Sequence, residues 1–199
     1  FFFLGFCLVI DDLTELRMPR FFYGGLLIGL SVAMRSLSLV AMFGLLFILG
    51  ARLFNRNARA RVLAASCWLV TGVVLASAYW FVRDWICTGN PVYPYLGSFF
   101  GNKELAYLSE LYFQDMGLPK SPLTFLTIFW DITFRPHYFD YHHWVGPFYL
   151  AALPLTIFAG FRIQRVRPHL AFVLYSVAMW YFTGQNVRYL LPVLPIYLY

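Results

Sequence analysis

The stretch from Val62 to Val82, VLAASCWLVTGVVLASAYWFV, decides the fold class of this chain. It places 21 consecutive uncharged residues between Arg61 and Arg83. A helix needs about 20 apolar residues to cross the hydrocarbon core of a membrane. We therefore expect a membrane-spanning helix here, with a cation at each boundary.

The composition of the whole chain agrees with this. Of the 199 residues, 61% are hydrophobic, 21% aromatic and only 12% charged, and the mean hydropathy is +0.67. Soluble domains carry about 25% charged residues, so these charges are too few to cover a water-facing surface. The composition excludes a soluble enzyme, a disordered tail and a disulfide-built secreted module.

Two more uncharged runs have the length of a membrane span. One comprises the 21 residues 141–161, and the other comprises the 20 residues 168–187. A further helix is expected to begin at Tyr189. Together these runs predict an all-α fold, a polytopic bundle of transmembrane helices.

The stretch from Phe21 to Ala51 has 31 residues and one charge, Arg35. As a single helix it would be about 46 Å long, well beyond the apolar core of a membrane. We expect two short helices with a turn at Arg35 and Ser36. One long tilted helix with a snorkelling Arg35 is the alternative. Three small residues predict close packing against another helix: Gly24, Gly25 and Gly29.

Both ends of the chain lie inside apolar runs, and the first residue is Phe1. We therefore expect residues 1–199 to be an internal piece of one membrane-embedded domain that continues beyond both ends.

The loop charges predict an orientation in the membrane. Residues 51–61 and 162–168 contain arginines and no acid, so both loops are expected to be cytoplasmic. Residues 83–140 contain four cations and six acids and are expected to face outward. At 58 residues this segment is too long for a passive connector. Its apolar run from Leu123 to Trp130 predicts a short helix lying in the membrane interface.

With two passes in the stretch 21–51, three arginines reach the outer face: Arg35, Arg83 and Arg188. A guanidinium can hold a phosphate with two parallel hydrogen bonds, so these residues are a candidate phosphate site. Snorkelling anchors are their alternative role. Tyr93 and Tyr189 either add hydroxyl contacts or belong to the aromatic belt of the membrane interface.

No metal, cofactor or nucleic-acid partner is expected. His142 and His143 are adjacent and cannot face the same way on a helix, and the three cysteines lack zinc-site spacing. The formal net charge of +6 lies in short clusters between apolar runs and forms no basic stripe. Three carboxylates are candidate general bases: Asp84, Asp131 and Asp140.

Three stretches resemble a known family. They are Trp80–Tyr95 (WFVRDW, then TGNPVYPY), Val187–Pro195 (VRYLLPVLP) and Gly24–Arg35 (GGLLIGLSVAMR). The first is similar to a helix that exits into a T-G-N-P-V-Y-P loop. The second is similar to a helix that starts with R-Y-L-L-P, and the third to a helix that ends in a cation. These features occur in the GT-C superfamily of bacterial membrane glycosyltransferases, relatives of protein mannosyltransferases and of the aminoarabinose transferase. The resemblance covers roughly residues 20–199. Arg35 stands where lysine is common and Asp84 where asparagine is common.

The resemblance implies transfer of a sugar from a polyprenyl-phosphate carrier to a glycan, lipid or protein acceptor. The reaction would take place at the outer face of a bacterial inner membrane. In the family the catalytic aspartate lies in the first external loop, so the catalytic residue is expected upstream of Phe1. Arg35 and Arg188 are then the first candidates for phosphate contact, and Arg83 is next.

Two other functions remain open. The first is a transporter or flippase that uses the same arginines to pass an anionic or lipid-linked substrate without catalysis, to which short broken helices are suited. The second is an assembly subunit whose external segment binds a partner.

Overall fold

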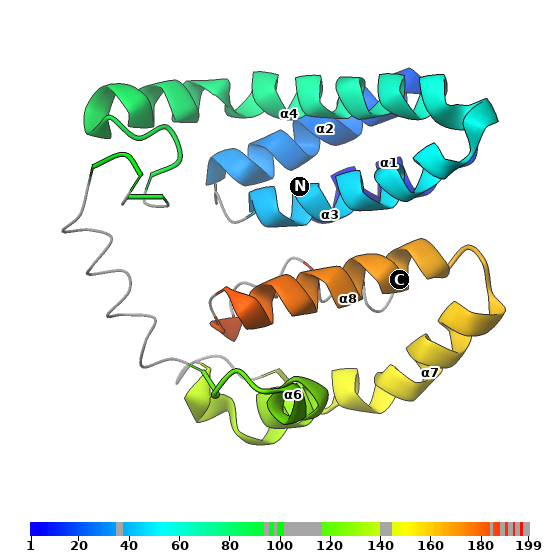
Figure 1. The fold of residues 1–199 in the computed structure, drawn as a ribbon, viewed down its shortest axis with the longest axis vertical. Coiled ribbons are helices and arrows are strands. Elements are labelled where there is room, and N and C mark those ends of the chain that lie inside the picture. The colour runs from blue at the N-terminus through cyan, green and yellow to red at the C-terminus, as the bar shows by residue number, and fades with distance from the viewer. Residues whose placement is uncertain are drawn as a thin grey trace. The chain divides into compact units, whose positions relative to one another are not determined.

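The computed structural model describes residues 1–34, 38–93, 96–97, 99–101, 117–139, 145–183, 185–187, 190, 193 and 196. The chain divides into two compact units, Phe1–Leu108 and Ser109–Tyr199, and each is described by itself. All regular elements in the described residues are helical, which confirms the all-α prediction. The first unit contains α1 (Phe2–Ile10), α2 (Met18–Met34), α3 (Ser38–Ala51) and α4 (Arg59–Thr88). The second contains α6 (Pro122–Phe134), α7 (Phe148–Arg162) and α8 (Arg167–Phe182) (Figure 1).

The stretch 21–51 forms two helices, as predicted. A hydrogen bond of 2.9 Å joins the hydroxyls of Ser31 in α2 and Ser38 in α3. In one continuous helix these residues would be about 10 Å apart along the axis, so the chain must reverse between them. The predicted turn at Arg35 and Ser36 lies outside the described residues.

Backbone contact between α2 and α4 forms the core of the first unit. A Cβ on Gly29 would lie 2.6 Å from the carbonyl oxygen of Val73, and Gly25 and Gly72 face the opposite backbone even more tightly. Glycine allows such an approach because it has no side chain to separate the helices. Since residues 25 and 29 meet residues 69–72 and 73–76 in the same order, the two helices run parallel.

Close approach at glycines also packs α1 against α2. A Cβ on Gly5 would lie 2.7 Å from the carbonyl oxygen of Gly24. A Cβ on Gly24 would lie 2.7 Å from a methyl group of Val9, so α1 runs antiparallel to α2. The predicted packing role of the α2 glycines is confirmed.

The turn from α1 to α2 is built around a buried carboxylate. Asp12 is fully buried and accepts hydrogen bonds of 2.6 Å from both the backbone N–H and the Nε of Arg17. The hydrogen bond to Asp12 raises the pKa of the Arg17 guanidinium. The Arg52 guanidinium donates to the carbonyl of Leu13, so this turn and the loop after α3 lie at the same end of the unit.

In the second unit, side chains in α8 and just after it hold the segment that precedes α6. The Tyr181 hydroxyl accepts a hydrogen bond of 2.8 Å from the backbone N–H of Ser121. The Gln185 side chain accepts from the N–H of Leu118 at 2.7 Å and donates to its carbonyl at 3.1 Å. Ser121 also caps α6 in a reciprocal pair of hydrogen bonds with Thr124.

In the described residues, one helical stretch is long and apolar enough to cross a membrane. It comprises the 33 residues Arg56–Thr88, with a mean hydropathy of 1.8 in its most apolar window, and it indicates membrane association. The predicted spans 141–161 and 168–187 are shorter as helices, because α7 begins after Pro147 and α8 ends at Phe182. Beyond Phe182, Gln185 and Asn186 bond to Leu118 and Trp180 instead of continuing α8.

The predicted interfacial run from Leu123 to Trp130 lies in α6, which has two distinct faces. One face exposes four apolar side chains to at least half of their surface: Leu123, Leu126, Trp130 and Phe134. The opposite face buries Ile128, Asp131 and Ile132. At 13 residues α6 is about 20 Å long, too short to cross a membrane but suited to lie along its surface.

Substitution of Gly72 by alanine should destabilise the first unit, because the new methyl group would overlap the backbone of α2. We expect a loss of about 1–3 kcal/mol, measured as a lower Tm of the detergent-purified protein by tryptophan fluorescence. Gly50→Ala is the matched control, since no atom lies within 4 Å of a Cβ there. Equal Tm values for the two variants would contradict the role given to the glycine contact.

Candidate functional site

The last turns of α4 bring three polar and aromatic side chains onto one face. Trp80, Arg83 and Asp84 are spaced three and four residues apart, which places them on the same side of a helix. The Arg83 guanidinium carbon lies 4.8 Å from the centre of the Trp80 ring, and Nε of Arg83 lies 3.6 Å from Oδ1 of Asp84. The ring and the carboxylate therefore limit where the guanidinium can go.

The TGN segment ends α4 and turns the chain. Gly89 has a φ of 70°, the left-handed conformation that ends many helices, and its N–H donates to the carbonyl of Trp85 at 2.8 Å. The Thr88 hydroxyl donates to the carbonyl of Asp84 at 2.7 Å.

Asn90 stabilises the turn from the inside. Its side chain is fully buried, and Oδ1 accepts the backbone N–H of Val92 at 3.0 Å. The carbonyl of Asn90 accepts the N–H of Tyr93 at 3.3 Å. These bonds direct Pro91, Val92 and Tyr93 back toward the helix ends.

A pocket of about 240 Å³ results. Its walls come from the end of α2, the last turns of α4 and the returning chain: Val32, Ala33, Met34, Ser77, Trp80, Phe81, Asp84, Pro91, Val92 and Tyr93. It lies at the opposite end of α2 and α4 from Asp12 and Arg52, because both helices run parallel away from that end.

The lining combines aromatic surface with a carboxylate. The volume is below the range of about 300–1,000 Å³ that is usual for drug-sized ligands, so one small group fits, such as a sugar ring or a phosphate. Asp84 can accept hydrogen bonds from hydroxyls, and the rings of Trp80 and Tyr93 offer apolar faces with a polar edge. The Arg83 guanidinium beside the pocket can hold an anion.

The structure places two of the five predicted site residues. Tyr93 lines the pocket, and Arg83 lies beside it against Trp80 and Asp84. Arg35, Arg188 and Tyr189 lie outside the described residues, although Arg35 directly follows the lining residue Met34 in the chain. Trp80 also lines the pocket, although it was not predicted as a site residue. The helical spacing of WFVRDW was the signal that could have revealed it.

The described residues contain no group of three or more histidine, cysteine, aspartate or glutamate side chains that could hold a metal ion. His142, His143 and Asp140 lie outside them. Of the other candidate bases, Asp131 is buried in α6, where it accepts a hydrogen bond from Thr127 at 2.7 Å and lies 3.4 Å from Arg135. Asp131 therefore has a structural role, as the partner of Thr127 and Arg135.

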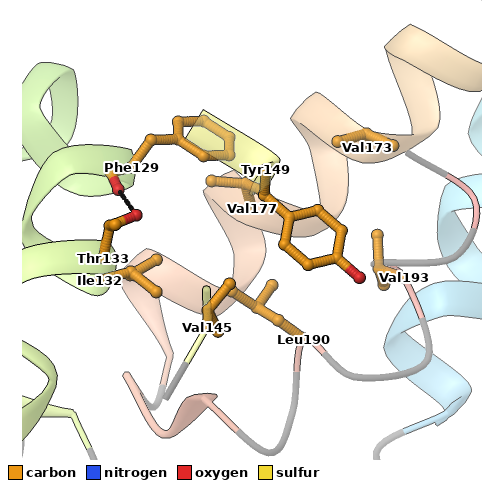
Figure 2. Close-up of a pocket in the computed structure, with 9 residues that line it drawn as sticks. All are labelled: Phe129, Ile132, Thr133, Val145, Tyr149, Val173, Val177, Leu190 and Val193. Carbon is orange, nitrogen blue, oxygen red and sulfur yellow. Dashed lines mark hydrogen bonds between the residues drawn. The ribbon is translucent and has the colours of Figure 1, made fainter. Parts of the chain in front are cut away.

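The second unit contains an apolar cavity of about 20 Å³ (Figure 2). Its lining is contributed by α6, the residue Val145 before α7, α7, α8 and the C-terminal segment: Phe129, Ile132, Thr133, Val145, Tyr149, Val173, Val177, Leu190 and Val193. The Thr133 hydroxyl donates to the carbonyl of Phe129 at 2.8 Å. A single water occupies about 10–15 Å³ by this measure, so the cavity is a packing gap and does not accommodate a sugar or a phosphate.

Comparison of the chain with models of protein families, with curated protein sequences and with solved structures finds no significant match.

Replacing Asn90 with alanine should loosen the returning chain, because a buried bond to the Val92 amide is lost. We expect local opening to become easier by about 1–3 kcal/mol, seen as faster hydrogen exchange in residues 90–93. Asn57→Ala, at an exposed asparagine of the opposite loop, is the control. Unchanged exchange at residues 90–93 would show that Asn90 does not hold the pocket wall.

Proposed function

We propose that this chain is part of a polytopic membrane glycosyltransferase of the GT-C type. It transfers a sugar from a polyprenyl-phosphate carrier to an acceptor at the outer face of a bacterial inner membrane. The observation that carries the proposal is the pocket at the end of α2 and α4, where Trp80, Asp84 and Tyr93 meet beside the Arg83 guanidinium.

The pocket has the parts that binding of a phosphosugar requires. A sugar ring can stack on the aromatic surface of Trp80 and Tyr93, and its hydroxyls can donate hydrogen bonds to the Asp84 carboxylate. The leaving group of the transfer is a lipid phosphate, and its negative charge is stabilised by positioned cations. Arg83 supplies one such cation, and Arg35 and Arg188 are proposed as the others. In the proposed reaction the general base comes from the family's first external loop.

The charge distribution of the first unit supports the proposed orientation. The arginine-rich loop after α3 and the pocket lie at opposite ends of α4. Because basic loops stay in the cytoplasm, the pocket then opens at the non-cytoplasmic rim of the membrane. A lipid-linked donor presents its phosphate at this depth.

A transporter or flippase is the second candidate, and the paired short helices favour it. α2 and α3 have 17 and 14 residues and reverse direction between Ser31 and Ser38. Discontinuous helices of this kind form substrate sites in many transporters.

Binding of farnesyl phosphate to the full-length protein tests the role of Arg83. We expect Arg83→Gln to weaken binding roughly tenfold or more, because a charge-assisted hydrogen bond contributes about 1.5–3 kcal/mol. Isothermal titration calorimetry in detergent measures the Kd. Arg135→Gln is the matched control, since Arg135 is also an exposed arginine paired with a neighbouring aspartate. Equal Kd values for the two variants would exclude Arg83 from the phosphate site.

Turnover in detergent separates the two candidate functions. The donor is a labelled polyprenyl-phosphate sugar from membrane extracts. A transferase should consume this donor in detergent, because the reaction needs no sealed membrane. A flippase should leave the donor intact. Absence of labelled product, with farnesyl phosphate still bound, would favour the flippase.

A further inference from the structure

The loop between α3 and α4 carries a concentrated positive charge, and no acidic side chain in the described part of the chain forms an ion pair with it. Residues 51–61 contain four arginines and no acid: Arg52, Arg56, Arg59 and Arg61. The neighbouring turn between α1 and α2 is different, because Asp12 and Glu15 pair with its arginines at 2.6–3.4 Å. The excess charge at this end of the unit is therefore confined to the loop 51–61.

The loop is folded, which gives this charge a defined position. It forms two short 3₁₀ turns, Arg52–Phe54 and Arg56–Ala58. The Asn55 side chain accepts from the N–H of Asn57 at 3.2 Å. Nε of Arg59 donates to the carbonyl of Leu53 at 2.7 Å, and Arg52 bonds to Leu13.

Two of the four arginines are thus used to hold the loop, and two are not. Arg56 and Arg61 are exposed, and neither makes a hydrogen bond or ion pair with a described residue. Their guanidinium groups keep their full hydrogen-bonding capacity for a ligand.

An exposed aromatic side chain lies among these charges. Phe54 is the last residue of the first 3₁₀ turn and is 87% exposed. A positive-inside signal needs only the charges, so the orientation of the chain does not account for Phe54. Cations that flank an exposed aromatic side chain are typical of surfaces that insert among lipid headgroups.

We propose that the loop 51–61 binds the phosphate headgroups of anionic lipids. Arg56 and Arg61 contact the phosphates, and Phe54 inserts at the level of the acyl-chain boundary. The position of Arg61 along α4 fits the depth of the lipid headgroups, because Arg61 directly precedes the apolar stretch that begins at Val62. The site requires only that α4 spans a membrane and is independent of any reaction at the pocket.

Short-chain lipids test this with the full chain in detergent. Dioctanoyl phosphatidylglycerol should raise the Tm in a saturable way, and dioctanoyl phosphatidylcholine should have a much smaller effect. The double variant Arg56→Gln/Arg61→Gln should raise the half-saturating concentration roughly 25-fold, at about fivefold per arginine. Both substitutions spare the bonds made by Arg52 and Arg59, so the loop should stay folded. Phe54→Ser should weaken the same response without a change in charge.

The controls distinguish the source of the phosphate. Inorganic phosphate should not reproduce the Tm shift. Arg135→Gln, which removes an exposed cation directly after α6, should leave the lipid response unchanged. An equal shift with phosphatidylcholine or with inorganic phosphate would overturn the proposal. An unchanged half-saturating concentration in the double variant, or in Phe54→Ser, would also overturn it.

Discussion

Direct backbone contact between α2 and α4 is the constraint on which the first unit depends. Glycines at positions 25, 29 and 72 let the two helices approach until a Cβ on either side would overlap the opposing chain. This contact fixes both the distance and the register of the helices. Because the register is fixed, the end of α2 lies beside the last turns of α4, and the pocket forms between them.

The first unit is also chemically polarised along α4. At one end, the buried Asp12 pairs with an arginine in the turn between α1 and α2, whereas the arginines of the loop 51–61 form no ion pair with an acidic residue in the described ranges. At the other end, the buried Asn90 folds the chain back, and Tyr93 joins Trp80 and Asp84 around the pocket. α4 thus separates the cationic loop 51–61 from the pocket. A few local hydrogen bonds shape the chain at each of these ends.

Much of the first unit could be predicted from the sequence. Runs of uncharged residues gave α4, the lone Arg35 indicated the break between α2 and α3, and closely spaced glycines indicated close packing. Partners distant in sequence could not be predicted. The pairing of Gln185 with Leu118 joins residues 67 positions apart and leaves no local pattern. Because Gln185 bonds to Leu118, α8 ends at Phe182. The uncharged run 168–187 therefore predicted a longer helix than the one that forms. Tyr93 in the pocket lining and Arg83 beside the pocket were both candidates from the sequence, whereas the role of Asn90 depends on a backbone turn.

The Gln185 amide mimics a peptide group, since it accepts from and donates to the main chain of Leu118 as a neighbouring strand would. Tyr181 and Lys120 extend this lock with bonds to Ser121 and Phe182. The segment before α6 and the end of α8 are therefore one mechanical element. Any displacement of the former must break its hydrogen bonds to the latter, so residues 117–121 and the end of α8 should move together.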